Sequence, residues 1–113
     1  MIRFILTTFP DEASARSTVC TLLDEHLIAC GTLLPGASSL YRWKGEIEES
    51  REVVVLLKTS AERAESCRER LAGCHPYEVP EIVNFSPSEC SESYARWVLE
   101  SVAGGRSVEM GDT

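Results

Sequence analysis

The chain has 113 residues and a mass of 12.5 kDa, the size of one domain, and its 43% hydrophobic and 26% charged residues are typical of a soluble globular protein. Eleven Lys and Arg against eighteen Asp and Glu give a formal charge of -7, which argues against nucleic-acid binding and favours the binding of cations. The five cysteines are odd in number and never spaced C-x-x-C, so we expect reduced thiols and no disulfide framework.

The first elements predicted along the chain are a strand and a helix. Residues 2–8 form an apolar run rich in β-formers that closes at Pro10, as expected for a strand near the centre of a sheet. Asp11 follows as a helix N-cap. Apolar residues then recur at helical spacing from Ala15 to His26, so this segment is predicted to form one helix.

A long β-hairpin is predicted next. Residues 28–34 are apolar and end at Pro35-Gly36, which predicts a strand interrupted by a bulge. Pairing is expected to resume over residues 38–43, and Lys44-Gly45 is the candidate for the tight turn. The three glutamates after this turn should be solvated, and the returning arm runs to Lys58.

Two helices and one strand complete the predicted order. Thr59-Ser60-Ala61-Glu62 fits a capping box for a second helix that ends at Gly73. Residues 82–85 are predicted to form a strand, with Pro80 at its start or on an edge. Ser91 can cap a last helix with one apolar side, made of Tyr94, Trp97, Val98 and Val102.

This order of elements predicts an α+β fold of the ferredoxin-like split βαβ type, a βαββαβ sandwich with one added C-terminal helix. We assign residues 1–103 to this domain. Residues 104–113 have few apolar side chains and two adjacent glycines, so we expect a fraying tail.

The predicted hairpin is too long for a solitary domain. Arms of about twelve residues at ~3.3 Å per residue would reach ~40 Å, whereas a domain of ~100 residues has a diameter of roughly 34 Å. Tyr41 and Trp43 lie near the end of one arm, and exposed edge strands with large rings aggregate unless they are covered. Self-association through these strands is therefore favoured over a twisted hairpin that folds back onto its own helices.

Two long and unusual blocks carry a family resemblance: Ser39–Ile47 reads Ser-Leu-Tyr-Arg-Trp-Lys-Gly-Glu-Ile, and His75–Ile82 reads His-Pro-Tyr-Glu-Val-Pro-Glu-Ile. With them, from Met1 to about Val102, the chain resembles the CutA divalent-cation tolerance proteins. The other segments that match in order are Leu6–Asp11, Ile28–Cys30, Leu34–Gly36, Leu57–Thr59, and Tyr94 with Trp97.

The resemblance implies a cytoplasmic protein that forms a tight homotrimer through its hairpin strands and associates with copper and other divalent cations. It implies no agreed reaction and no required cofactor, so we expect no enzyme. The trimer resembles that of the PII signalling proteins, which suggests ligand sensing by analogy only. Two positions depart from the family pattern: Gly31-Thr32 replaces an Asn after the cysteine, and Cys90 replaces a Gly before the last helix.

Cys74 and His75 are the first candidates for a metal site. A thiolate and an imidazole suit copper or zinc, and Glu78 is near enough in sequence to add an oxygen ligand. In the family, copper ligands have been proposed in a His-His pair and in a first-strand Cys; the resemblance places Cys74 and His75 at the pair and Thr7 at the strand position. The alternative is that His75 caps the second helix and binds backbone, with Cys74 a small buried hydrophobe.

A second candidate site is a cleft that the resemblance places between subunits. Aromatic walls with one Lys and one Glu could hold a small anionic or zwitterionic ligand, or these residues could only seal the interface. The six residues concerned are Tyr41, Trp43, Lys58, Tyr77, Glu78 and Tyr94.

Other chemistries find less support. His26 and Cys30 are four residues apart, but a strand already begins between them, so Cys30 is expected to be a core cysteine. A nucleophile made of Cys30 or Cys74 with His75 lacks an orienting third group. RNA recognition by this fold would need basic side chains beside exposed rings, which the acidic balance opposes.

The compartment and partners follow from the same observations. No stretch approaches the ~20 apolar residues of a membrane span, and the start of the chain is too polar beyond Leu6 for a secretory signal. We expect a cytoplasmic protein without membrane or nucleic-acid partners. Three function classes stay open: a metal-binding protein, a PII-like sensor of a small ligand, and an assembly that positions an unidentified protein partner.

Overall fold

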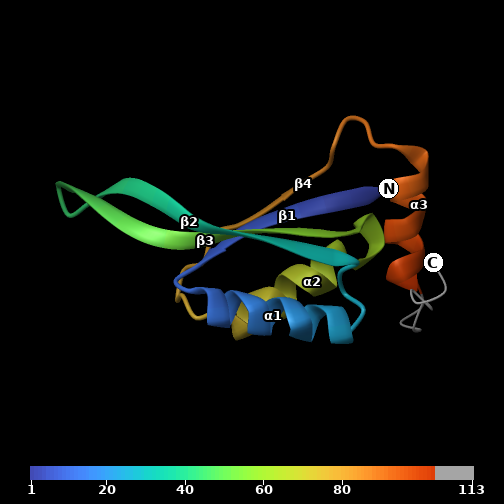
Figure 1. The fold of residues 1–113 in the computed structure, drawn as a ribbon, viewed down its shortest axis with the longest axis horizontal. Helices are drawn as coiled ribbons and strands as arrows, with labels where there is room; N and C mark the ends of the chain where they lie inside the picture. Colours follow the sequence, from blue (N-terminus) through green and yellow to red (C-terminus); the bar gives the residue numbers. More distant parts are fainter. Residues whose placement is uncertain (104–113) are drawn as a thin grey trace.

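The computed structural model describes residues 1–103 as four strands and three helices (Figure 1). The predicted tail, residues 104–113, lies outside the described residues. The predicted order of elements is confirmed. In chain order the elements are β1 Ile2–Phe9, α1 Glu12–Asp24, β2 Cys30–Trp43, β3 Glu46–Ser60, α2 Ala61–Cys74, β4 Ile82–Phe85 and α3 Glu92–Ser101.

The four strands form one antiparallel sheet in the order β2-β3-β1-β4. This order is that of the predicted split βαβ arrangement, so the predicted α+β fold is confirmed. Helices α1 and α2 lie side by side on one face of the sheet, whereas α3 lies at the end of the sheet that carries the N-terminus (Figure 1). Within residues 1–103 none of the helices combines the length and the apolar character that crossing a membrane would require.

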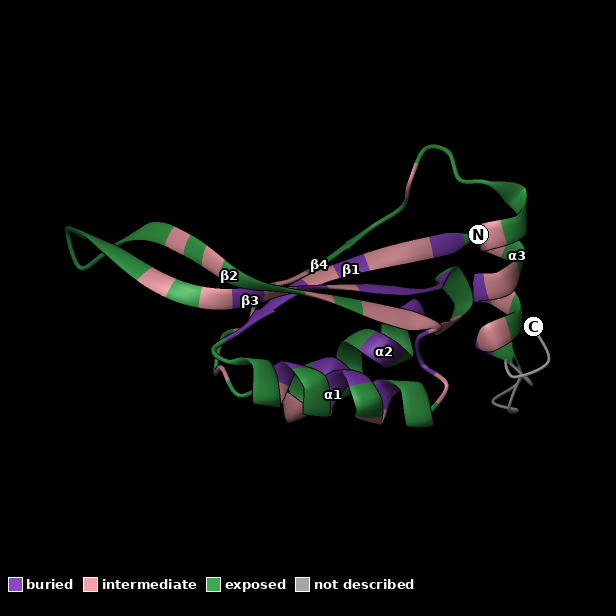
Figure 2. Ribbon diagram, viewed as in Figure 1, coloured by how far each residue is buried: buried purple, intermediate pink, exposed green. Residues whose placement is uncertain are grey.

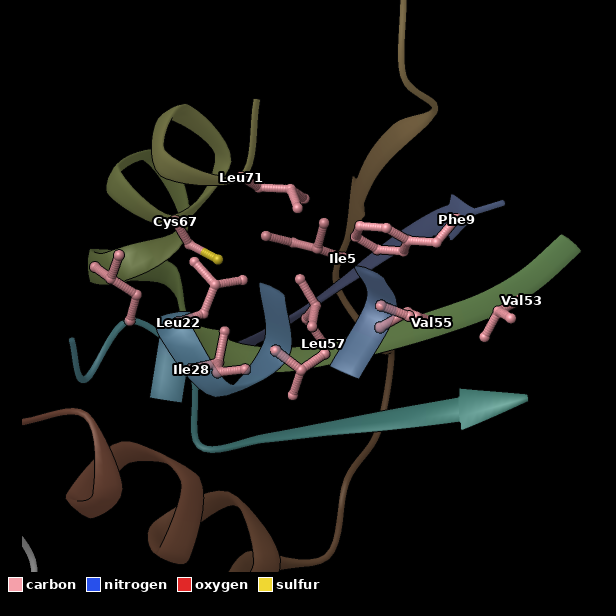
Figure 3. Close-up of a cluster of buried hydrophobic side chains, with 12 residues drawn as sticks. Ile5, Phe9, Leu22, Ile28, Val53, Val55, Leu57, Cys67 and Leu71 are labelled. Atoms are coloured by element: carbon pink, nitrogen blue, oxygen red, sulfur yellow. The ribbon is translucent and has the colours of Figure 1, made fainter. Parts of the chain in front are cut away.

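The hydrophobic core fills the space between the sheet and the two helices (Figure 3). Side chains alternate between the two faces of a strand. Ile5, Val55 and Leu57 lie on the face toward the helices and belong to the core. Leu22 of α1 and Leu71 of α2 are fully buried against them. These side chains form one core layer between the sheet and the two helices. Complete burial of a Leu side chain contributes about 1.5–3 kcal/mol to the stability of the fold.

Local side-chain chemistry sets where the helices begin. Asp11 accepts a hydrogen bond from the Ser14 N–H at 2.7 Å and caps α1, as predicted. The predicted capping box is wrong by one residue: Ser60, not Thr59, caps α2 and accepts from the Arg63 N–H at 3.0 Å. The Thr59 hydroxyl instead donates to the Leu27 carbonyl at 2.6 Å.

The end of α2 also differs from its prediction. The helix continues through Gly73 to Cys74, and His75 is its C-cap. Gly73 does not adopt a positive φ, so it does not form the left-handed cap by which a glycine stops a helix.

The hairpin of β2 and β3 extends beyond the helices and gives the molecule extents of 50 × 28 × 23 Å (Figure 1). At its end Lys44 and Gly45 have φ values of 51° and 82°, and two positive φ values identify a type I′ turn. The predicted bulge is confirmed, because the register shifts between Leu34 and Ala37 while β2 continues to Trp43. The outer half of the hairpin is largely exposed (Figure 2).

The sheet face opposite α1 and α2 is apolar and partly uncovered. Along each strand the residues of this face alternate with the core residues. Residues that pair across neighbouring strands lie on the same face of the sheet. Leu34 and Val83 are 47% exposed and Phe85 is 40% exposed. We call this the open sheet face; it consists of Phe4, Leu6, Leu34, Val54, Leu56, Val83 and Phe85.

Candidate functional site

The ring of His75 is fixed by hydrogen bonds on both nitrogens. Nδ1 accepts from the Tyr77 N–H at 3.0 Å, and because a backbone N–H can only donate, Nδ1 carries no proton. Nε2 therefore carries the proton and donates to the Thr8 carbonyl at 2.8 Å, with the Thr7 hydroxyl 3.2 Å away. The ring stacks on Phe9 with centroids 4.4 Å apart. Burial lowers the pKa of His75, and the hydrogen bond to Thr8 opposes that shift.

The structure does not gather the predicted metal ligands. The Cys74 thiol lies 3.8 Å from the Leu71 carbonyl within its own helix, and Glu78 is exposed. In the part of the chain that the structure describes, no three His, Cys, Asp or Glu side chains form a group that could hold a metal. The arrangement of His75 follows the alternative stated above, in which it binds backbone at the end of the helix. A site of Cys74, His75 and Glu78 stays a prediction, which requires one ring nitrogen of His75 to give up its hydrogen bond to Thr8 or Tyr77.

A pocket of about 420 Å³ lies where the hairpin leaves the sheet. Both arms of the hairpin contribute to it, and the segment between α2 and β4 forms another wall. We call it the Glu52 pocket; it is lined by Thr8, Ser39, Leu40, Tyr41, Ser50, Glu52, Tyr77, Val79 and Glu81.

The Glu52 carboxylate is held by hydroxyl groups. Ser39 donates to Oε1 at 2.7 Å, and the Tyr77 hydroxyl donates to Oε2 at 2.9 Å. The Tyr41 hydroxyl and Ser50 Oγ lie 2.8 Å apart beside them. Burial, together with the hydrogen bond to Glu52, raises the pKa of Tyr77 to about 12. Tyr77 thus keeps its proton and donates to Glu52 at neutral pH.

The pocket carries negative charge without a basic partner. No Lys, Arg or His is among its lining residues, and a second carboxylate, Glu81, lines it. Glu52 takes part in none of the ion pairs formed within residues 1–103. A half-buried carboxylate that lacks a counter-charge favours a cation beside it.

Lys58 forms a separate cluster on the same strand. It is buried, and its ammonium group donates to Cys30 Sγ at 3.5 Å and to the Thr32 hydroxyl. Burial is the largest cause that raises the pKa of Tyr94 of α3, and the neighbouring Cys30 raises it further. Lys58 also takes part in none of the ion pairs within residues 1–103, so this cluster holds a positive charge without a carboxylate.

The six predicted cleft residues thus fall into separate places within one chain. Tyr41 and Tyr77 line the Glu52 pocket. Lys58 follows Glu52 by six residues on β3, which is about 20 Å at ~3.3 Å per residue, and Tyr94 lies with it. The other two are outside both groups: Glu78 is exposed, and Trp43 lies beside the turn with the Lys44 ammonium 5.8 Å from its ring centroid.

Three residues that line the pocket, Glu52, Ser39 and Glu81, are not among the site residues predicted from the sequence. A signal for Glu52 is present: alternation along β3 places it on the face of Val54 and Leu56, where an isolated carboxylate requires partners. Ser39 and Glu81 show no such signal. They reach the pocket only because the hairpin base and the segment before β4 meet in space.

Comparison with known proteins agrees with this architecture. Residues 3–101 match the family model described as CutA1 divalent ion tolerance protein. The divalent-cation tolerance protein CutA of Thermus thermophilus is 39% identical over 101 residues, covering 89% of this chain and 98% of that protein. That of Pyrococcus horikoshii is 43% identical over 96 residues, covering 85% and 93%.

Solved structures show the same similarity. The Thermus thermophilus protein has a TM-score of 0.83 at 39% identity, covering 88% of this chain and 97% of that one. A structure from Archaeoglobus fulgidus, described as a periplasmic divalent cation tolerance protein CutA, has a TM-score of 0.85 at 28% identity, covering 90% and 99%.

Proposed function

Because the chain belongs to the CutA1 divalent ion tolerance protein family, we propose that it acts in tolerance of divalent cations by binding or sensing metal ions, without catalysis. The observation that carries this proposal is the family match, which spans residues 3–101. The formal charge of -7 supports it, because a negative protein raises the local concentration of cations. Copper is the cation we propose to test first.

A homotrimer formed through the hairpin strands is the second part of the proposal. Leu40, Trp43 and Ile47 on the hairpin are 66%, 58% and 62% exposed. Together with the open sheet face they leave large apolar side chains uncovered, and exposed apolar patches mark interaction surfaces. Long exposed strands also offer unpaired backbone groups. Further copies of the same chain would cover both.

We also propose a cytoplasmic location. All five cysteines are free, although Cys20 and Cys90 are exposed, and free exposed thiols suit a reducing compartment. The Archaeoglobus fulgidus relative is described as periplasmic, so cell fractionation with a compartment marker is the test. Recovery of the protein in the periplasmic fraction would contradict the proposal.

Copper titration tests the metal-binding part. We expect the wild type to bind copper and Cys74→Ser to weaken that binding at least about tenfold, because a thiolate is the preferred soft ligand. His75→Ala should have a smaller effect because both ring nitrogens are already hydrogen-bonded. Cys20→Ser, which removes an exposed thiol from α1, is the matched control. Unchanged affinity in both Cys74→Ser and His75→Ala would exclude this site, and a wild type without copper affinity would contradict metal binding.

A second candidate function is a PII-like sensor that binds a small ligand in a cleft between subunits. The observation that favours it is charge: Glu52 is half-buried and Lys58 is buried, and neither has an oppositely charged partner in the ion pairs of residues 1–103. Such groups occur where a ligand supplies the missing charge. A metabolite that co-purifies with the protein at a fixed stoichiometry would support this alternative.

A further inference from the structure

We infer that the Glu52 pocket binds a small organic cation, an ammonium or guanidinium compound. The inference rests on the ligand-binding alternative proposed above only for the idea of a small-ligand sensor; it names a ligand class and places the site within one chain. It needs no metal ion. It is carried by the charge, the lining and the volume of one pocket within a single chain.

The charge of the pocket selects a cation. Glu52 and Glu81 both line it, and no basic residue does. The anionic or zwitterionic ligand expected from the sequence depended on Lys58. Lys58 lies six residues beyond Glu52 on β3, outside the pocket, and its ammonium group donates to Cys30 and Thr32. An anion in the Glu52 pocket would therefore face carboxylates without a compensating charge.

The donor set favours an organic cation over a metal ion. The pocket has no His or Cys among its lining residues, and both Glu52 oxygens already accept hydrogen bonds from Ser39 and Tyr77. Hard metal ions such as Ca²⁺ need about six or more oxygen ligands, whereas the lining supplies carboxylates only from Glu52 and Glu81. In the described part of the chain no group of three His, Cys, Asp or Glu could hold a metal. An N–H donor can instead use the lone pairs that remain, since a carboxylate offers about four acceptor positions.

The walls and the volume fit the same class of ligand. Tyrosine rings attract cations, and Tyr41 and Tyr77 both line the pocket. Leu40 and Val79 add apolar surface that methylene groups can cover. The volume of about 420 Å³ is much larger than a bare ion needs and lies in the range of small-molecule sites.

Nuclear magnetic resonance of the tyrosine rings in the full chain tests the inference. The probes are butylammonium chloride and tetramethylammonium chloride, and 1-butanol and sodium chloride at matched ionic strength are the controls. We expect saturable shifts of the Tyr77 and Tyr41 signals with the two cations and none with the controls. Weak binding satisfies the inference, because two carboxylates and two tyrosine rings supply most of the attraction.

Variants locate the binding. Glu52→Gln should weaken affinity for both cations at least about tenfold, since it removes the negative charge that faces the cation. Glu49→Gln removes the same charge from an exposed position on the same strand, outside the lining, and should change affinity less than about twofold. If Glu52→Gln fails to fold, Tyr77→Phe takes its place. It removes one hydroxyl that holds Glu52 and should weaken binding several-fold.

Four results would overturn the inference: no saturable shift with either cation, equal shifts with 1-butanol, equal losses in Glu52→Gln and Glu49→Gln, or binding of zinc in the pocket without binding of the ammonium probes. Copper titration and sedimentation of the same samples separate this inference from the proposed function. If the cations bind while copper binding or the trimer fails, only the proposed function is contradicted. If the cations fail to bind in a copper-binding trimer, only this inference is.

Discussion

His75 links the end of α2 to β1 through a neutral ring, and this gives the protein a specific pH dependence. Its Nε2 proton goes to the Thr8 carbonyl and its Nδ1 lone pair to the Tyr77 N–H. Protonation of the ring would put a second proton on Nδ1, where the backbone N–H already points. The fold therefore favours the neutral imidazole, in agreement with the direction of the pKa shift that burial causes.

We predict that stability falls as the pH drops below the ordinary histidine pKa of 6.5. The folded-state pKa of His75 is lowered, so the unfolded chain takes up the proton first and unfolding becomes easier. The stabilisation that comes from the lowered pKa of His75 is fully present above pH 6.5 and is lost as the pH falls toward the folded-state pKa. Urea unfolding at pH 7.5 and pH 5.5, roughly one unit above and below the ordinary histidine pKa, measures the difference in the free energy of unfolding.

A variant assigns that pH dependence. His75→Gln keeps a hydrogen-bonding side chain but cannot titrate, so its loss of stability between the two pH values should be smaller than that of the wild type. His26→Asn removes the other histidine, at a position with a φ of 59° that Asn tolerates, and should retain the full loss. Equal losses in His75→Gln and the wild type would refute the assignment.

Residue pairs distant in sequence explain why the candidate site was only partly predictable. The adjacency of Cys74 and His75 is visible in the sequence, but the Thr8 carbonyl that occupies His75 is 67 residues away. The partners of Glu52 are 13 and 25 residues from it. Local patterns report which chemistry a side chain could perform, whereas the groups that use up its hydrogen bonds come from other elements.

Among the elements, the packing of α1 on β2 depends on Gly31. A Cβ added there would lie 2.8 Å from Val19 Cγ1 and 3.2 Å from Leu57 Cδ2. Both neighbours belong to the core cluster, where overpacking costs about 1–3 kcal/mol.

We therefore predict that Gly31→Ala lowers the free energy of unfolding by about 1–3 kcal/mol. Gly73→Ala is the control, because its Cβ would meet nothing within 4 Å and the residue lies in α2. It should stabilise the protein by up to about 1 kcal/mol through helix propensity. Chemical denaturation of both variants checks the pair, and a Gly31→Ala protein as stable as the wild type would contradict the packing described.

The elements themselves follow from local rules, and their ends reveal the limits of those rules. Asp11 and the Lys44-Gly45 turn act within four residues, so the sequence predicts them correctly. Thr59 and Ser60 can both cap a helix. Ser60 is the cap because the Thr59 hydroxyl donates instead to the Leu27 carbonyl, 32 residues away in the sequence. Local sequence patterns do not predict a contact between residues so far apart.

The whole molecule presents apolar surface on the side that its helices leave uncovered. If copies of the chain cover the open sheet face, a charge introduced there should separate the copies without unfolding them. We predict that Val83→Glu, at a position 47% exposed, yields a smaller assembly with unchanged secondary structure by circular dichroism. Leu23→Glu introduces the same charge at a position 39% exposed on α1 and should leave the assembly intact. Loss of assembly in Leu23→Glu alone would place the interface on the helical face.

Sedimentation equilibrium of the wild-type protein tests the central claim most directly, because it measures mass without assumptions about shape. The proposed homotrimer predicts one species of three times the 12.5 kDa chain mass, stable on dilution. A single species of 12.5 kDa at high protein concentration would contradict the account.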